Sequence, residues 1–214
     1  MIPESLLKKY KSRIVKLKKD EATFQTGDPA TNFHVVKSGK IKMVTYSRDG
    51  REFVQGYFVD GQSFGEPPFF NHMPYPSSGI AVVDSEVWKC SYDPFMQLLR
   101  DNFDIHIKLT QVLSGRLVYK SIMLSELAGE EAEHRIATLI EYFRKEDGSG
   151  LDTIYKVPYT RQQLADMTGL RVETVIRCVK GMEQRGILCL TDAGKILWGN
   201  SSEGTNRKRR RRST

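Results

Sequence analysis

The sequence has few cysteines, no long apolar run and little net charge outside its last residues. Its three cysteines, Cys90, Cys178 and Cys189, lie far apart without paired spacing, which argues against a disulfide framework or a metal cluster. No window approaches the ~20 apolar residues of a membrane span, and residues 1–19 contain no apolar run of signal-peptide length. We therefore expect reduced thiols, no membrane partner and a cytoplasmic protein.

The basic character of the chain is concentrated in its last residues. The formal net charge is +7, and the tail Asn206–Thr214 contributes six basic residues and no acidic one. The rest of the chain is therefore almost neutral. A run of like charges is usually solvated, so we expect residues 201–214 to be disordered. The tail either adds sequence-independent attraction to nucleic acid or is foreign to the natural protein, and both readings stay open.

Between Phe24 and Cys90 the sequence contains short apolar runs of alternating pattern, which are typical of β-strands. Turn signals separate them, and Asp49-Gly50 predicts a hairpin because glycine accepts the positive φ of a tight turn. Six to eight short strands without a helical period predict an antiparallel β roll or sandwich. We assign residues 1–100 to this domain. The runs are FHVV, KIKMVTY, EFVQGYFV, IAVV and EVWKC.

From about Ser91 the apolar pattern becomes helical. A short helix in SYDPFMQLLRD precedes Asn102–Leu127, which contains no proline and predicts one long helix with two apolar flanks. One flank can cover the roll, and the other needs a partner. A matching helix of a second subunit is the simplest partner, and burial within one chain is the alternative. We assign residues 101–128 to dimerisation. The flanks are Leu109, Leu113, Leu117, Leu124 and Leu127, and Ile105, Val112, Val118, Ile122 and Met123.

A further helix is expected in HRIATLIEYFRKED, and the stretch Thr160–Leu188 predicts two helices joined by a tight turn. Thr160 is a candidate N-cap, with Gln163 at the capping-box spacing. Gly169 stands where the turn needs a residue that tolerates positive φ. Two short strands, Leu188–Leu190 and Ile196–Trp198, predict a hairpin or wing. Residues 129–200 therefore predict a winged helix-turn-helix, and a solvated helical hairpin is the alternative.

The outer side of the second predicted helix has side chains suited to DNA. Arginine can bond guanine O6 and N7, and glutamate can accept from cytosine N4, when a helix N-terminus enters the major groove. Thr160, Arg161, Gln162 and Thr174 are candidates for phosphate contacts. The complete set of candidate DNA contacts is Thr160, Arg161, Gln162, Arg171, Glu173, Thr174, Ile176, Arg177 and Lys180.

On these motifs the chain resembles the Crp–Fnr family of bacterial transcription regulators, from about residue 10 to residue 198. The resemblance rests on DGQSFGE at Asp60–Glu66, on the long helix, and on TRQQLADMTGLRVETVIRCVKGMEQRGIL. It implies an α+β fold with an N-terminal cyclic-nucleotide-binding-like antiparallel β roll, a dimerisation helix and a C-terminal winged helix-turn-helix. It also implies homodimers on inverted half-sites about one DNA turn (~34 Å) apart, with RNA polymerase as a further candidate partner.

The resemblance implies that Glu173 and Arg177 form the base-contacting pair. Val172 stands where the cyclic-AMP-binding branch has an arginine, and valine is the arrangement of the Fnr branch, whose half-sites look like TTGA. That branch has a serine at the position of Ile176. The preferred half-site is therefore expected to differ from both patterns.

The resemblance also implies an effector pocket, in which Glu66 holds the ribose position. Pro76 falls where the phosphate-binding arginine is expected, and proline has no backbone N–H to donate. A cyclic phosphate would then lose its charge-assisted partner, so we expect no cofactor and no dependence on cyclic AMP. Phe69, Phe70 and Tyr75 are expected to make the pocket wall apolar. The candidate pocket residues are Phe64, Gly65, Glu66, Ser77, Ser78, Lys120 and Ser121.

Two other functions are weighed against DNA recognition. A cyclic-nucleotide-type sensor or regulatory subunit without sequence-specific DNA recognition is the alternative, and the helix-turn-helix argues against it. An enzyme has no support, because the sequence shows no nucleophile–base spacing, glycine-rich phosphate loop or metal motif. We therefore expect no catalytic residue and no metal ligand. His34 and His72 are lone histidines, for which core or surface roles are expected.

Overall fold

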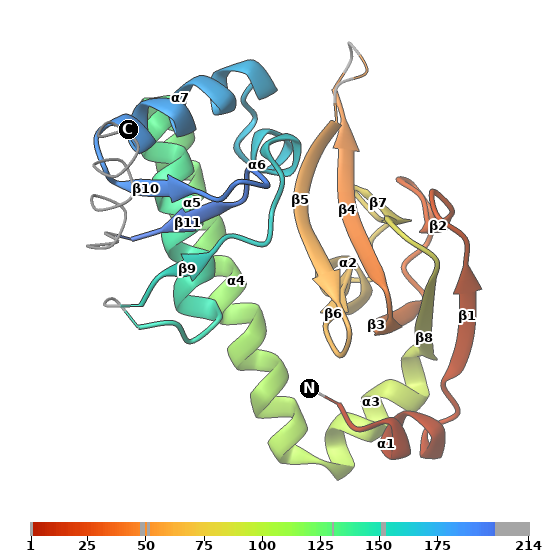
Figure 1. Ribbon diagram of the computed structural model, residues 1–214. Helices are drawn as coiled ribbons and strands as arrows, with labels where there is room; N and C mark the ends of the chain where they lie inside the picture. The colour runs from red at the N-terminus through yellow and green to blue at the C-terminus, as the bar shows by residue number, and fades with distance from the viewer. Residues whose placement is uncertain (1, 48–49, 51, 130, 151–152, 200–214) are drawn as a thin grey trace. The chain divides into compact units, whose positions relative to one another are not determined.

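The computed structural model describes residues 2–47, 50, 52–129, 131–150 and 153–199 (Figure 1). The chain divides into two compact units, Met1–Arg116 and Leu117–Thr214. The division falls within the longest helix, α4 (Phe103–Gly129). None of the helices in these described ranges combines the length and apolarity that a membrane crossing requires.

In the described part of the first unit, eight strands form two antiparallel sheets, with the strand orders β1-β8-β3-β6 and β2-β7-β4-β5 (Figure 1). The predicted antiparallel β roll is confirmed. The pairing of β4 with β5 also confirms the predicted hairpin, although Asp49 in its turn lies outside the described residues. The strands are β1 (Arg13–Leu17), β2 (Ala22–Phe24), β3 (Asn32–Ser38), β4 (Lys40–Tyr46), β5 (Glu52–Val59), β6 (Ser63–Phe64), β7 (Ser78–Ala81) and β8 (Ser85–Ser91).

The sheet that contains β3 and β8 is buried on both faces, because alternate side chains of a strand point to opposite sides. Val36 and Val87 belong to an inner core between the two sheets, together with Phe24 and Phe64. On the other face an outer core packs the sheet against four helices. These are α1 (Glu4–Lys9), α2 (Glu66–Phe70), α3 (Tyr92–Asp101) and the beginning of α4, whose buried contacts include Leu7, Phe69, Phe95, Leu98, Ile105 and Leu109.

The position of Phe69 corrects the expectation that it lines the pocket wall with Tyr75. Phe69 is buried in the outer core, with its ring centroid 5.9 Å from Phe33 and 5.7 Å from Phe95. Phe70 packs at the edge of the same core, whereas Tyr75 belongs to the inner core. The reason is that helix α2 turns its apolar side toward α3 and away from the space between the sheets.

Helix α4 confirms the predicted long helix, but its burial changes along its length. Ile105 and Leu109 are buried in the outer core, and Leu113 packs against that core. Further along, the exposed fraction is 69% for Leu117 and for Leu124. Leu109 and Leu117 were expected on the same flank, but they differ in burial. The outer core covers Leu109 at the beginning of the helix and does not include Leu117.

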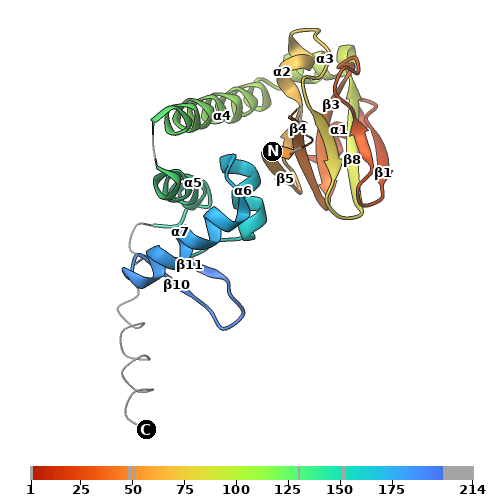
Figure 2. The same ribbon diagram turned by 90° about the horizontal axis from the view of Figure 1, so that it is seen from above.

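The second unit contains a winged helix-turn-helix, as predicted. Its helices pack around Ile136, Leu139, Leu164, Val175 and Met182, all of which are buried. Strands β10 and β11 form the predicted hairpin, which lies next to α7 in Figure 2. Strand β9, which was not expected, pairs with β11 to complete a three-stranded sheet. The elements are α5 (Ala132–Glu146), β9 (Tyr155–Lys156), α6 (Arg161–Thr168), α7 (Val172–Gln184), β10 (Leu188–Leu190) and β11 (Ile196–Trp198).

Candidate nucleic-acid interface and ligand pocket

The turn between α6 and α7 is fixed at both ends of α6. The Thr160 hydroxyl accepts from the Gln163 backbone N–H (3.2 Å), and the Gln163 side chain accepts from the Thr160 N–H (3.0 Å). This reciprocal pair is the predicted capping box. Gly169 ends α6 in the left-handed conformation with φ of 67°, which glycine adopts without steric cost. The cap and the glycine together set the direction in which α7 leaves the turn.

Helix α7 has one apolar and one exposed side. Val175, Val179 and Met182 are buried at the spacing of one helix face. On the opposite side Glu173, Ile176, Arg177 and Lys180 are exposed and form a stripe along the first two turns and into the third. Within the described residues, the side chains of Glu173, Arg177 and Lys180 make no hydrogen bond or ion pair. The donors and acceptors of this stripe are therefore available to an external partner.

The remaining candidate DNA contacts lie at the ends of the two helices. Arg171 is exposed at the N-cap of α7, and the half-buried Thr174 follows within its first turn. Gln162 donates from Nε2 to the Asp166 carboxylate (2.7 Å). Arg161 donates to the backbone carbonyl of Gly194, in the turn of the β10–β11 hairpin. Partial burial lowers the pKa of Arg161, and its contact joins the start of α6 to the wing.

The base of the wing is attached to α5 by polar contacts. The indole N–H of Trp198 donates to Glu141 Oε1 (2.5 Å), and Glu141 Oε2 lies 2.7 Å from Arg144 Nη2. With Arg161 at the wing tip, these contacts hold both ends of the hairpin against the helices.

Aromatic contacts connect the second half of α4 with the beginning of α6. Tyr119 on α4 stacks on Tyr142 of α5, with ring centroids 4.2 Å apart. The neighbouring Phe143 lies 4.6 Å from Tyr159, which directly precedes the N-cap Thr160. Burial raises the pKa of the Tyr119 hydroxyl. Packed rings therefore join the second half of α4 to the residue that precedes the helix-turn-helix.

The candidate ligand pocket of the first unit contains a buried ion pair. Glu66 begins α2 with a side chain that is 3% exposed, and its Oε1 lies 2.7 Å from Arg116 Nη1. Arg116 Nη2 donates to the Ser63 carbonyl (2.8 Å), and the guanidinium lies 5.0 Å from the ring centroid of Phe58. Sequence reasoning missed Arg116. It is the one arginine of the predicted long helix, and the need of a buried carboxylate for a cation could have indicated it.

Aromatic rings fill the inner core beside this ion pair. Phe24 stacks on Tyr75 with ring centroids 3.6 Å apart, and lies 5.0 Å from His34 and 5.9 Å from Phe64. Gly65 has a φ of +73°, and an added Cβ would lie 3.1 Å from atoms of Phe24 and Tyr75. The close approach of these rings therefore requires glycine at this position.

The other predicted pocket residues are placed differently. The Ser78 hydroxyl accepts from the Thr26 backbone N–H (3.0 Å). The buried hydroxyls of Ser77 and Ser63 have no hydrogen-bond partner within the described residues. Lys120 and Ser121 are exposed on the part of α4 that belongs to the second unit, so their role in the pocket stays a prediction.

The N-terminus of α2 is poor in backbone donors. Its second and third residues are Pro67 and Pro68, and proline carries no N–H. The first turn of a helix is where backbone N–H groups usually bind an anion. Two of those groups are absent here, so the beginning of α2 offers few backbone donors to an anion.

His34 is buried beside the inner core, and a core role was one of the two roles expected for it. Its Nδ1 lies 3.4 Å from the Tyr75 hydroxyl, and burial together with the nearby Lys89 lowers the pKa of its imidazole to about 3. His72 stacks on Tyr92, with ring centroids 4.6 Å apart. Within the described ranges no group of three or more histidine, cysteine, aspartate or glutamate side chains could hold a metal ion.

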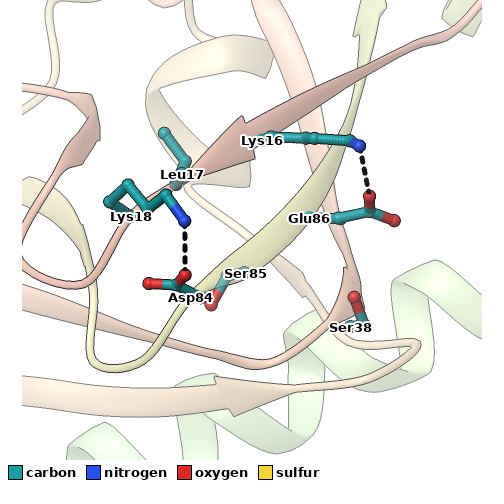
Figure 3. Close-up of a pocket in the computed structure, with 7 residues that line it drawn as sticks. All are labelled: Lys16, Leu17, Lys18, Ser38, Asp84, Ser85 and Glu86. Carbon is teal, nitrogen blue, oxygen red and sulfur yellow. Dashed lines mark hydrogen bonds and ion pairs between the residues drawn. The ribbon is translucent and has the colours of Figure 1, made fainter.

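A separate open hollow of about 380 Å³ lies at the edge formed by β1 and β8 (Figure 3). Lys18 pairs with Asp84 at 2.8 Å, and Lys16 lies 3.8 Å from Glu86. Because its charged side chains compensate one another, the hollow offers little charge to a ligand. It contains none of the predicted site residues.

Comparison with known proteins finds one family model in each of the two units. Residues 14–102 match the family model of the cyclic nucleotide-binding domain, and residues 134–197 match that of the Crp-like helix-turn-helix domain. The cAMP-activated global transcriptional regulator CRP of Pasteurella multocida is 28% identical over 175 residues, which cover 81% of this chain and 84% of that protein.

Solved structures share the fold, as two examples illustrate. The c-di-GMP responsive global regulator CLP of Xanthomonas campestris is 25% identical, with a TM-score of 0.70 over 92% of this chain and 100% of that chain. FixK2 of Bradyrhizobium japonicum superposes with a TM-score of 0.71 at 21% identity, over 91% of this chain and 96% of that one. The cyclic nucleotide-binding-type roll, the long helix and the helix-turn-helix therefore occur together in solved structures, one of which is a global regulator.

Proposed function

Because this chain belongs to the Crp–Fnr family of transcription regulators, we propose that it is a homodimeric, sequence-specific DNA-binding regulator that does not depend on cyclic AMP. Its partner is an inverted-repeat operator in double-stranded DNA, contacted by one α7 helix of each subunit. The observation that carries the proposal is the exposed stripe of α7, where Glu173 and Arg177 have no partner within the described residues.

The chemistry of the stripe supports base recognition. A helix that enters the major groove presents its first turns to base edges, and these turns hold Glu173 and Arg177. Arginine bonds guanine in bidentate fashion, and glutamate accepts from cytosine. We propose phosphate contacts for Lys180 at the end of this stripe, for Arg171 at the N-cap of α7 and for Thr160 at the beginning of α6. The wing, attached through Arg161 and Trp198, adds a second element beside the helix.

The second half of α4 supports a homodimer. Leu117, Val118 and Leu124 are each exposed to 60% or more in the single chain. Exposed apolar side chains at helical spacing are typical of a helix that packs against another. A second copy of the same helix covers these side chains on both subunits at once, because a two-fold interface buries the same patch on each subunit. The dimer also places two α7 helices on the two half-sites.

The first unit supports a response that differs from cyclic-AMP binding. Glu66 already has Arg116 as its partner, Pro76 cannot donate to a phosphate, and α2 lacks two N–H groups at its beginning. The names of the relatives refer to different nucleotides, cAMP for one and c-di-GMP for another, so the fold does not prescribe the ligand. We propose that the first unit binds a ligand of another class, or none.

A sensor or regulatory subunit without sequence-specific DNA recognition is the alternative. It predicts that the exposed side of α7 has no role, whereas the residues on that side match the donors and acceptors of base edges. We propose no enzymatic activity, and we place the protein in the cytoplasm with RNA polymerase as a further partner.

Selection of bound sequences from random duplex DNA, with the full chain and with and without cell extract, tests the proposal. We expect enrichment of an inverted repeat whose half-sites are about one helical turn (~34 Å) apart. Enrichment only in the presence of extract would point to an effector. No enriched sequence under either condition would overturn the proposal in favour of the sensor alternative.

A further inference from the structure

One member of the exposed stripe of α7 is apolar. Ile176 is 50% exposed and is the only exposed large hydrophobic side chain of α7, whose residues Val172–Gln184 are all described. Glu173 precedes it by one helical turn, and Arg177 follows it directly. A single exposed hydrophobic residue needs no explanation on an ordinary surface. Here its neighbours are the two side chains proposed to contact bases, so its surroundings in the complex are base edges.

The local fold gives no other reason for isoleucine at this position. The buried side of α7 is formed by Val175, Val179 and Met182, and Ile176 lies outside that face. A β-branched residue is also a poorer helix former than alanine, lysine or glutamine. Isoleucine on an exposed helix face therefore costs the free protein some stability, and an apolar contact in a complex would offset this cost.

The major groove offers one apolar group at its base edges. This is the C5-methyl group of thymine, which cytosine and uracil lack. Removing an apolar side chain and a methyl group from water is favourable, at about 0.8 kcal/mol per buried CH₂ group. Glu173 and Arg177 recognise cytosine and guanine through hydrogen bonds. They therefore do not recognise the methyl group of thymine.

We propose that Ile176 is a specificity-determining residue that recognises the C5-methyl group of one thymine in each half-site. The inference rests on the proposed DNA-binding function and deepens it. It predicts that the base next to those contacted by Glu173 and Arg177 is thymine, and that the methyl group accounts for the preference.

Replacement of thymine by deoxyuridine tests this contact, because it removes the methyl group and leaves the pairing edge unchanged. Each thymine of the selected duplex is replaced in turn, symmetrically in both half-sites, and binding is measured by fluorescence anisotropy. We expect one position at which the wild-type protein loses about three- to fivefold in affinity per half-site, the value that corresponds to one lost methyl contact. At the same position, the Ile176→Ala variant should bind the thymine-containing and the uracil-containing duplex with equal affinity.

A matched control is Ile187→Ala. Ile187 is also exposed, at 38%, but it lies after the end of α7, so this variant should keep the loss on uracil substitution. Ile176→Val, which retains a β-branched apolar side chain, should keep most of it.

The outcomes separate the two proposals. Sequence-specific binding without any uracil-sensitive position would overturn the role of Ile176 and leave the proposed function intact. A uracil-sensitive position that persists in Ile176→Ala would also overturn it. Absence of specific binding to any duplex would overturn the proposed function, and the role of Ile176 with it.

Discussion

Arg116 Nη1 lies 2.7 Å from Glu66 Oε1, and this contact joins the long helix to the beginning of α2 inside the first unit. The Glu66 side chain is 3% exposed, whereas that of Arg116 is 25% exposed. The same guanidinium also donates to the Ser63 carbonyl. Glu66 therefore has its cation within the chain, and a ligand would have to compete with Arg116 for this carboxylate.

The stability of the first unit should depend on this ion pair. Replacing Arg116 by methionine leaves a buried carboxylate without a partner, and we expect a loss of about 3 kcal/mol in the free energy of unfolding. Glu66→Gln combined with Arg116→Met should recover part of it, because the uncompensated charge is gone. Urea denaturation measures these values.

The exposed pair Lys18–Asp84 is the control for this experiment. The Lys18 and Asp84 charged groups lie 2.8 Å apart, close to the 2.7 Å of the buried pair, but their side chains are 78% and 64% exposed. Lys18→Met should cost less than about 1 kcal/mol. A similarly small loss for Arg116→Met would contradict the buried role of the Glu66 pair.

Cyclic nucleotides should not bind with micromolar affinity. Pro76 and the two prolines of α2 remove donors that a cyclic phosphate needs, and Glu66 is already paired. Calorimetry with cyclic AMP and cyclic GMP measures this directly, and Pro76→Arg, which restores a cationic donor, is the matched variant. Micromolar binding of either nucleotide by the wild type, with tighter DNA binding, would contradict the proposal.

Much of the fold could be predicted because it depends on local patterns. Periodicity or turn chemistry predicts the strands of the roll, the long helix and the capping box at Thr160. The same signals predict the wing at Leu188–Leu190 and Ile196–Trp198. Helix α1 and strand β1 were missed because both are short and charged residues interrupt their apolar residues. Strand β9 was missed because two residues give no periodic signal.

The pocket could not be predicted to the same extent, because it depends on contacts between distant segments. Arg116 is fifty residues from Glu66, and no local pattern relates the two. Phe69 was expected beside Tyr75, but α2 directs it to the outer core, a choice that depends on packing against Phe95. The partner of Arg161 in the wing is likewise a distant carbonyl group.

Dimerisation should fail when the exposed part of α4 becomes charged. Leu117→Asp places a charge in the proposed interface, where its desolvation is not compensated, and we expect monomers in analytical ultracentrifugation at micromolar concentration. DNA affinity should fall together with dimerisation. Val83→Asp, which changes an apolar residue of the roll that is 47% exposed, is the control and should remain dimeric. A monomeric wild-type protein at that concentration would contradict the homodimer.

Stability should fall as the pH falls below about 6.5, because of His34. The pKa of His34 is lowered to about 3 in the folded protein, whereas an unfolded histidine has a pKa of about 6.5. The unfolded state therefore binds a proton that the folded state does not. This difference should cost about 2 kcal/mol between pH 7.5 and pH 5. His34→Phe should flatten this slope in urea denaturation.

The charged tail should act differently from α7 on DNA. Residues 207–212 carry only basic side chains, and they lie outside the described residues. Their deletion should weaken binding to all duplexes equally and reduce the dependence of affinity on salt concentration, since such contacts release counterions without reading bases. A loss confined to the selected sequence would contradict this assignment.

Base recognition by α7 is tested most directly with the Arg177→Ala variant. Its affinity is measured by fluorescence anisotropy, at one salt concentration, for the selected inverted repeat and for a scrambled duplex of equal length. If α7 contacts bases through its exposed stripe, the variant should lose about 1–3 kcal/mol on the selected site and almost nothing on the scrambled one. Equal losses on both duplexes, or no loss on either, would contradict the role of α7 in sequence recognition.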